Sequence, residues 1–501
     1  MTTPALLLEL ILKPRGDAPP TTSVGYALAG AYAIELGEAG RRLASHRLLV
    51  RGAADLAGES GQLFGDEAAL LREIVRLIAS ADCLVTARGQ RLELPVLEAL
   101  ALRHGVPLPG HFEGDDPYRA RRSPYNVAGQ LDLLAFLADG DRRLRGLEPA
   151  LVLSLLFREP LAAGLSARDG EGPLAAAKRR ALGSYLLYLR VQRLRGLLDE
   201  DQLTERLSEL ASAGLESALA GATRPAWGGA ARAPVATTLD GVAPGLLAFD
   251  IETVVDLEAL SRAVGRSLEP AEVEGAVQAI SGPGATFAPA PFHRVVALAM
   301  VYWDPGANRI DLARLVLGER GGAGAPLEEE DLLSTFWRVA AGQRLVSYNG
   351  KRFDLPVLLY RSLPYPLEAG WYLASARPPH AQYRHPHSRR QLDIFDRLAG
   401  GLSPGKLGDL LGTLGLPGKL DADGSDVQRM WESGKGDEVG DYCLQDAAQT
   451  FLLGMRYLAI AGELSPSRLR EVTLAARERF GREPSLASIL ERGQRFFLAG
   501  G

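Results

Sequence analysis

The stretch LVSYNGKRFDLPVL, which runs from Leu345 to Leu358, has a counterpart earlier in the chain, LVTARGQRLELPVL, which starts at Leu84. The copies share Leu-Val, a glycine, an arginine and Leu-Pro-Val-Leu, but the later copy has Asn349 and Asp354 where the earlier one has an arginine and a glutamate. In both copies an apolar run of strand length leads to a turn with a glycine, and a helix-like segment follows. The repeated stretch predicts one fold used twice.

Two further pairs of segments recur in the same order. QLDLL, from Gln130, and QLDIF, from Gln391, lie 261 residues apart, which is also the offset between the two copies of the first stretch. SYLLYLRVQRLRG, from Ser184, and TFLLGMRYLAIAG, from Thr450, lie 266 residues apart. Chance similarity between leucine-rich segments is the alternative, but ordered spacing over such a length disfavours it. We interpret the pattern as a tandem duplication.

Strand-like and helix-like segments alternate around these landmarks, which is typical of an α/β fold with a mixed β-sheet flanked by helices. A chain of 501 residues is too long for one hydrophobic core. The stretch 221–244 is rich in Gly, Ala, Pro and Thr and is interpreted as a flexible linker. We therefore expect a first domain at 1–220 and a second at 245–501 that ends in helices. QLDIFDRLAG, from Gln391, is expected to be helical.

Composition excludes several classes of protein. The chain lacks an uninterrupted apolar run of membrane-spanning length, so no membrane association is expected. Its two cysteines, Cys83 and Cys443, are too few for a thiolate zinc cluster and fit a reducing cytoplasm. The net charge of −5 gives no overall attraction for nucleic acid, but cations at an acidic site can bridge to phosphates.

Carboxylates of the second copy occupy positions that a strand and two helices would bring together. Asp250 and Glu252 are two residues apart on a predicted strand, so their side chains share one face. Asp354 begins a helix, and Asp446 lies on a long helix with Tyr442 one turn before it. Converging acids need cations, and hard oxygen ligands suit Mg²⁺ or Mn²⁺. The alternative is that these acids are surface ion pairs and helix caps.

Three motifs in order, DIET from Asp250, YNGKRFD ending at Asp354 and YCLQD from Tyr442 to Asp446, resemble those of the DEDD superfamily of 3′–5′ exonucleases, in its DEDDy branch. PFHRVVALAM and NGKRFDLPVL look like the bacterial exonucleases related to the proofreading domain of family B DNA polymerases. The resemblance covers about Leu246 to Pro466. It implies a ribonuclease H-like (DnaQ-like exonuclease) fold for the tandem domains. Where the family often has His before its Leu-Asp pair, this chain has Gln.

The resemblance also implies a mechanism. Two ions, Mg²⁺ or Mn²⁺, would be held by Asp250, Glu252, Asp354 and Asp446, and Tyr442 would orient the attacking water. Cleavage would release 5′-mononucleotides from the 3′ ends of single-stranded nucleic acid.

Residues next to the second motif are candidates for substrate contact. Asn349 is expected either to bind the terminal sugar or phosphate or to form the turn. Phe353 is expected to stack on the terminal base or to join the core, and Lys351 to contact phosphate. In YRHPHSRR, from Tyr383 to Arg390, the arginines are favoured as phosphate contacts, and a metal role for the histidines is disfavoured.

The first copy has lost most of these side chains. Glu93 stands in the place of Asp354, and Arg180 and Ala176 stand in the places of Asp446 and Tyr442. The first strand offers only Glu9 for the acid pair. Because an arginine cannot be deprotonated to admit a metal, we expect a degenerate pseudo-nuclease domain in which Arg180 pairs with Glu93.

One carboxylate is kept in both copies, as Asp132 and Asp393. Because it survives where metal ligands are lost, it is assigned to the fold.

Three functions are considered. The leading one is a metal-dependent 3′–5′ exonuclease on single-stranded DNA ends. The second is an RNA-processing exonuclease with the same chemistry, because the sequence names no group that senses a 2′-hydroxyl. The third is a non-catalytic nucleic-acid-binding scaffold. The first domain is expected to offer a surface for a protein partner or for self-association.

Overall fold

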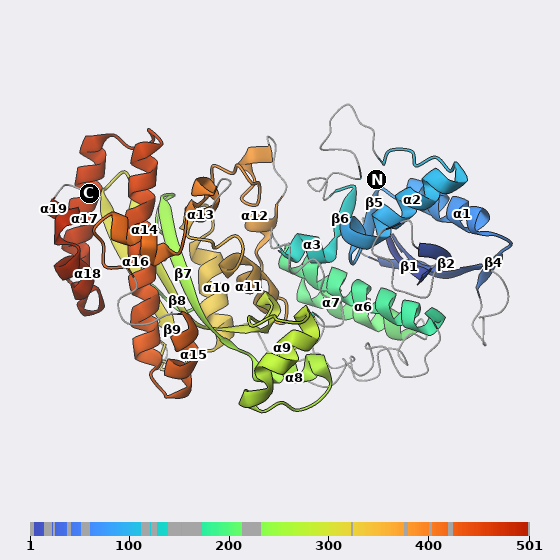
Figure 1. Cartoon of the computed structure of the whole chain (residues 1–501), viewed down its shortest axis with the longest axis horizontal. Coiled ribbons are helices and arrows are strands. Elements are labelled where there is room, and N and C mark those ends of the chain that lie inside the picture. The colour runs from blue at the N-terminus through green and yellow to red at the C-terminus, as the bar shows by residue number, and fades with distance from the viewer. Residues whose placement is uncertain are drawn as a thin grey trace. The chain divides into compact units, whose positions relative to one another are not determined.

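The computed structural model describes residues 5–14, 23, 26–37, 42–51, 61–111, 121, 128–138, 152, 173–212, 232–321, 324–374, 379–399, 403–418 and 424–498 (Figure 1). The chain forms two compact units. The first comprises Met1–Gly228 and Leu257–Pro289, and the second comprises Gly229–Asp256 and Ala290–Gly501. The first part of the expected linker, 221–231, lies outside the described residues, and its part from 232 to 244 contains neither helix nor strand.

The second unit is built on a five-stranded mixed sheet. Its strands are β7 (Leu246–Val255), β8 (His293–Asp304), β9 (Arg309–Val316), β10 (Arg344–Ser347) and β11 (Gln391–Asp393). Their order is β11-β10-β7-β8-β9. β7 and β8 are antiparallel, as are β8 and β9, whereas β10 runs parallel to both β7 and β11. The mixed α/β architecture is confirmed, as are the predicted strand that carries Asp250 and Glu252 (β7) and the one that leads into the repeated turn (β10).

Helix α16 (Gly436–Ile460) packs along this sheet, as Figure 1 shows. Its Ala447 and Phe451 are fully buried in one apolar cluster with Ala248 of β7 and Val301 of β8. The other helices are α10 (Glu329–Val339), α11 (Asp354–Ser362), α12 (Gly370–Leu373), α13 (Ile394–Leu398), α14 (Leu407–Thr413), α15 (Gly424–Glu432), α17 (Pro466–Phe480), α18 (Ala487–Arg492) and α19 (Gln494–Leu498).

The first unit has a six-stranded sheet. Its strands are β1 (Ala5–Pro14), β2 (Tyr26–Gly37), β3 (Arg42–Arg51), β4 (Gln62–Phe64), β5 (Cys83–Thr86) and β6 (Gln130–Asp132), in the order β4-β3-β2-β1-β5-β6. Its helices are α1 (Glu67–Ser80), α2 (Leu94–His104), α3 (Leu133–Ala138), α6 (Pro173–Leu194), α7 (Glu200–Ser212), α8 (Leu257–Val264) and α9 (Val273–Ser281). Helix α6 packs on β1 and β2.

The two sheets share their strand order and register. Apart from the extra β4, reading from β6 to β3 gives the same parallel and antiparallel pairs as reading from β11 to β9. Ala5 pairs with Cys83 as Leu246 pairs with Arg344. Four residues further along each strand, Glu9 therefore stands where Asp250 stands. A register shift follows at Ile11/Leu12 in β1 and at Glu252/Thr253 in β7, which is the same position in both.

A buried glutamate at the start of one helix is also common to both units. Glu329 of α10 accepts hydrogen bonds from the Val295 backbone (2.9 Å) and the Tyr365 hydroxyl (3.1 Å). Glu67 of α1 accepts from the Leu28 backbone (2.7 Å) and bonds to His104 Nε2 (2.8 Å). His104 and Tyr365 are again 261 residues apart. The same buried connection between a helix start, a strand and the next helix is thus made in each unit.

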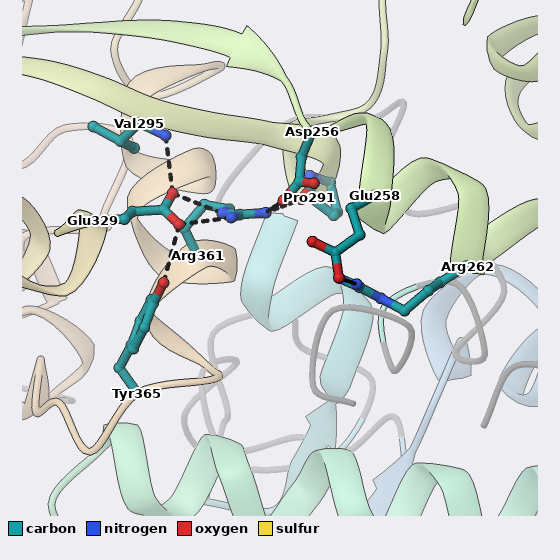
Figure 2. A network of polar contacts seen from close by, with 8 residues as sticks. All are labelled: Asp256, Glu258, Arg262, Pro291, Val295, Glu329, Arg361 and Tyr365. Atoms are coloured by element: carbon teal, nitrogen blue, oxygen red, sulfur yellow. Dashed lines mark hydrogen bonds and ion pairs between the residues drawn. The ribbon is translucent and has the colours of Figure 1, made fainter. Parts of the chain in front are cut away.

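In the second unit a buried arginine is added to this connection. Figure 2 shows Arg361 of α11 between Glu329 and Asp256. Its Nε and Nη2 donate to the two oxygens of Glu329 at 2.8 and 2.6 Å, and its Nη1 donates to Asp256 at 2.8 Å and to the Pro291 carbonyl at 3.5 Å. Asp256 directly follows β7, so Arg361 fixes the end of the strand that carries the acid pair.

Two expectations about elements were wrong or incomplete. QLDIF does not begin a helix, because Gln391–Asp393 pairs in parallel with β10 as strand β11 and the helix starts at Ile394. All three strand residues are buried, and a buried stretch this short carries no periodicity that separates strand from helix. Helices α8 and α9, between β7 and β8 in sequence, were not predicted.

The glycine of the repeated stretch is required by close approach. A Cβ at Gly350 would lie 2.6 Å from the Ser347 Cβ, and a Cβ at Gly89 would lie 2.1 Å from the Thr86 Oγ1. Both distances are far below van der Waals contact, so the turn after β5 and β10 admits only glycine. Within the described part of the chain, no helix has the length and apolar character needed to cross a membrane.

Candidate active site

Three carboxylates of the second unit meet in one place. Asp250 and Glu252 project from the same face of β7, and Asp446 comes from α16, which packs against that strand. One oxygen from each of the three lies within 4.8 Å of the others. Asp446 is buried, and the other two are half-buried. Convergence from a strand and a helix that are almost 200 residues apart is what the sequence motifs predicted.

Asp354 lies beside this cluster and outside the group of three. It is buried at the start of α11, and the N-cap position belongs to Phe353, so Asp354 is not the capping residue. Burial, helped by the charges of Asp393 and Asp446 and opposed by backbone hydrogen bonds from Asp354 itself and from Ile251, raises the pKa of Asp354 to about 7. Because Ile251 separates the two acids of β7, Asp354 lies next to them.

Tyr442 faces the same carboxylates. It lies one helical turn before Asp446 and is buried. Burial, followed by the charges of Asp446, Glu252 and Asp250, raises its pKa well above the ordinary value. The hydroxyl therefore keeps its proton and can donate a hydrogen bond into the acidic cluster.

The thiol of Cys443, next to Tyr442, contacts the backbone of the strand that carries Asp250. The Sγ of Cys443 donates to the backbone carbonyl of Asp250 at 3.3 Å. Burial and the neighbouring carboxylates raise the pKa of Cys443 well above its usual range. A protonated, buried thiol is a packing group that joins α16 to β7 and is not a metal ligand.

Asp393 organises the turn that leads to Asp354. Its carboxylate accepts from the backbone N–H groups of Asn349 (3.0 Å) and Lys351 (2.8 Å) and from the N–H of Asp396 in α13 (3.3 Å). Asn349 is held in the left-handed region, with φ of 64°. This arrangement supports the expectation that Asn349 forms the turn.

The first unit repeats this clamp, in which one carboxylate accepts from backbone N–H groups of the turn and of the following helix. Asp132 accepts from the backbone N–H of Gln90 at 2.8 Å and of Ala135 at 3.0 Å. Gln90 and Ala135 stand 261 residues before Lys351 and Asp396. The assignment of Asp132 and Asp393 to the fold agrees with these contacts.

The remaining candidates for substrate contact surround the turn. Phe353 is half-buried, and its ring meets that of His293 edge-on with centroids 5.0 Å apart. The Nδ1 of His293 lies 3.0 Å from the Thr253 Oγ1. Lys351 is buried, and its Nζ lies 3.4 Å from the His385 carbonyl oxygen.

At the corresponding place in the first unit, an ion pair joins the β1 acid to α6. The Nε of Arg180 donates to Glu9 Oε1 at 2.6 Å. The prediction that Arg180 pairs with Glu93 was wrong. Glu9 lies on the central strand against which α6 packs, whereas Glu93 is enclosed where the turn runs into α2. The contact depends on strand register, which the sequence does not display.

Glu93 is instead an enclosed carboxyl group. It is 1% exposed, and neither of its oxygens has a hydrogen-bond partner among the described residues. Burial raises its pKa to about 8, and Glu9 adds to the effect while Arg88 opposes it. Glu93 is therefore protonated at neutral pH.

The residues of the second unit fit a divalent cation. Asp250, Glu252 and Asp446 offer only hard oxygen donors, and their mutual repulsion would be relieved by positive charge. In the parts of the chain that the structure describes, they form the only group of three or more His, Cys, Asp or Glu side chains spaced to hold an ion.

A comparison with known protein families found one that matches part of the chain. Residues 285–492 match a family described as "Predicted 3'-5' exonuclease related to the exonuclease domain of PolB". The match indicates a 3′–5′ exonuclease domain in the second unit, and hence a hydrolase that acts on nucleic acid. It contains Asp354, Tyr442 and Asp446 but begins after Asp250 and Glu252, so the first motif is connected to it by the geometry of the cluster. No curated protein matches the chain.

Proposed function

We propose that the second unit is a metal-dependent 3′–5′ exonuclease that shortens single-stranded DNA from its 3′ end and releases 5′-mononucleotides. The observation that carries the proposal is the meeting of Asp250, Glu252 and Asp446 within 4.8 Å, inside the unit that contains nearly all of the segment 285–492 that matches the exonuclease family. Tyr442 and Asp354 at the edge of the cluster complete the residue set of the DEDDy type.

The roles of the side chains follow from their positions. Asp250, Glu252 and Asp446 would hold Mg²⁺ or Mn²⁺, two ions in the complete site, with Asp354 supporting them. The bound cations would supply Lewis-acid activation of water and charge stabilisation at the phosphate. The protonated Tyr442 hydroxyl orients the attacking water, because it faces the carboxylates and cannot act as a base at neutral pH.

We assign the binding of the 3′-terminal nucleotide to the turn after β10. Phe353 is held by the edge-on contact with His293, so its ring can receive a base without a large loss of side-chain entropy. Asn349 and Lys351 are proposed to contact the terminal sugar and phosphate. The buried stem of Lys351 limits this contact to a phosphate that approaches the His385 end of the turn.

The first unit is proposed to be a degenerate ribonuclease H-like copy of the second. Support comes from the common strand order, the register shift at one position, the paired clamps of Asp132 and Asp393, and the paired glutamates Glu67 and Glu329. The Arg180–Glu9 ion pair puts a cation at the position that corresponds to the proposed metal ligands of the second unit. Such a unit would serve as a clamp on substrate or as a docking surface for a protein partner or a second copy.

A direct assay separates the competing functions. End-labelled single-stranded DNA, duplex DNA and RNA are each incubated with the full chain in Mg²⁺, Mn²⁺ or EDTA. The proposal requires a ladder that shortens from the 3′ end of single-stranded DNA and stops in EDTA. Preference for RNA would establish the RNA-processing alternative, and strand binding without cleavage in either metal would establish the scaffold.

A further inference from the structure

The loop between α12 and β11 carries an unusual charge. Residues 380–390 read HAQYRHPHSRR, with three arginines, three histidines and no acidic residue. His387, Arg389 and Arg390 are exposed, and His385 is half-buried. In a chain with a net charge of −5, a concentration of positive groups in one loop calls for a binding partner or neutralising carboxylates.

The exposed arginines of this loop are Arg389 and Arg390. Some exposed arginines elsewhere in the second unit are ion-paired, as in Arg429–Asp426 (2.5 Å) and Arg309–Asp311 (2.8 Å). Within the described part of the chain, Arg389 and Arg390 form no ion pair. The nearby Glu463 is already paired with Arg344 at 2.6 Å.

The cations of the loop also act on one another. The pKa of His385 is lowered by burial and then by the charges of His387, His380 and Lys351. An anion placed along the loop would relieve this repulsion. A metal ion would not, and among the described residues these histidines belong to no metal-ligating group of three.

The loop is held in place by its own contacts. Arg397 of α13 donates to the Ser388 carbonyl at 2.7 Å, and Ser388 Oγ accepts from the Arg390 backbone at 3.0 Å. The buried Tyr383 donates to the Gln343 carbonyl at 2.8 Å, and Arg390 lies over its ring at 5.6 Å. A loop that is held in place loses little entropy when its side chains bind an extended polyanion.

One end of the row reaches the candidate active site. The His385 carbonyl lies 3.4 Å from Lys351 Nζ, and Lys351 belongs to the turn that leads into Asp354. The other end runs into β11, where the Arg390 carbonyl accepts from the Leu345 backbone at 2.8 Å. The cations therefore extend from the active-site turn along the edge strand of the sheet.

We infer that His385, His387, Arg389 and Arg390 bind the sugar–phosphate backbone of the nucleic-acid strand whose 3′ end lies in the acidic cluster. The inference rests on the proposed function and adds to it a path for the strand outside the reaction centre. Backbone contacts of this kind give affinity without base specificity and make binding salt-dependent. The loop thus favours a strand of several nucleotides over a dinucleotide.

The test measures binding in EDTA, so that no cleavage occurs, with a 5′-labelled single strand at salt concentrations between ~50 and ~200 mM. Arg389→Gln/Arg390→Gln is compared with the wild type and with the matched control Arg429→Gln/Arg482→Gln, which changes two exposed, ion-paired arginines of the same unit. Each lost phosphate contact lowers the salt slope by about 0.7, so the loop variant is expected to show a slope lower by about 1.4 and roughly tenfold weaker binding at ~100 mM salt. The control is expected to match the wild type.

A second loop variant, His387→Gln/Arg389→Gln, leaves the contact of Arg390 with Tyr383 intact and is expected to weaken binding in the same direction. Wild-type affinity and salt slope in both loop variants overturn the inference, even if the wild type degrades the strand in Mg²⁺. A wild type that neither binds nor degrades any strand overturns the proposed function itself, and the inference with it. The two failures are therefore distinguishable.

Discussion

Arg180 donates to Glu9 at 2.6 Å, and Glu9 occupies on β1 the register position that Asp250 occupies on β7. Arg180 itself stands at the repeat position of Asp446. The guanidinium therefore neutralises the first unit's buried carboxylate from the helix that supplies a carboxylate in the second unit. Glu9 is 3% exposed, so leaving it without a cation would be costly.

Replacing this cation by a third carboxylate tests whether the first unit retains the frame of a metal site. Arg180→Asp, made together with Asp446→Ala to disable the second site, is expected to lower the melting temperature in EDTA because three acids then face one another. Mn²⁺ should restore stability by about 2.7 kcal/mol at a hundredfold excess over its Kd. Thermal melting of the full chain over a Mn²⁺ titration measures both effects.

The control for that experiment is Arg180→Met in the same Asp446→Ala background. It removes the cation without adding a ligand, so its melting temperature should fall and stay low at every Mn²⁺ concentration. Equal Mn²⁺ responses in the two variants would show that the first unit holds no such frame.

Removing a carboxylate from the second unit should abolish cleavage and leave the fold intact. Asp446→Asn is expected to lower the cleavage rate by at least about 100-fold while the melting temperature in EDTA stays the same or rises, because repulsion in the metal-free cluster is relieved. The matched control is Asp437→Asn, the same change at an exposed position of the same helix. Near-wild-type cleavage by Asp446→Asn would sink the assignment of the cluster.

Tyr442→Phe removes only the hydroxyl that faces the cluster. Cleavage by this variant is expected to slow by about ten- to a hundredfold, with little change in KM or in the Mn²⁺ concentration that gives half-maximal rate, because the carboxylates remain. Steady-state rates over a Mn²⁺ titration separate the two quantities. A large shift in the metal requirement would instead make Tyr442 part of the ion-binding shell.

Much of this site could be predicted from sequence because its local geometry is short-range. Asp250 and Glu252 share a face through the two-residue period of a strand, and Tyr442 and Asp446 share one through the period of a helix. The meeting of the two pairs depends on how α16 packs on the sheet, and only the resemblance to known exonucleases supplied that step.

What could not be predicted depends on contacts between distant segments. The partner of Arg180 lies 171 residues away and is set by the register of β1. Gln391–Asp393 becomes a strand because β10 offers an open edge, although its residues alone do not favour one. The ion pairs of Arg361 with Asp256 and Glu329 likewise join residues 105 and 32 positions apart in sequence, so no local pattern predicts them.

The paired clamps allow an internally controlled test of Asp393. Asp393→Asn and Asp132→Asn should each cost about 1–3 kcal/mol of stability, because an amide replaces one acceptor by a donor that faces a backbone N–H. Only Asp393→Asn should also lower kcat, because only its turn leads to Asp354. Equal cleavage by both variants would make Asp393 purely structural, and the comparison of kcat with KM is the readout.

Glu93 predicts a pH dependence of stability that originates in the first unit. Its pKa in the folded chain, about 8, lies above the model-peptide value of 4.5, so the folded state holds the proton more tightly than the unfolded state. Its contribution is therefore fully present below pH 4.5 and is lost as the pH rises towards 8. Glu93→Gln mimics the protonated form and should remove this loss.

The measurement is the difference in melting temperature between Glu93→Gln and the wild type in EDTA from about pH 5 to about pH 9. The variant is expected to gain on the wild type up to about pH 8 and then to level off, because ionised Glu93 would face Glu9 in a buried site. The exposed Glu205→Gln serves as the control and should track the wild type at every pH. A constant difference for Glu93→Gln would mean that Glu93 is already ionised in the folded chain and that a cation such as Arg88 stabilises its charge.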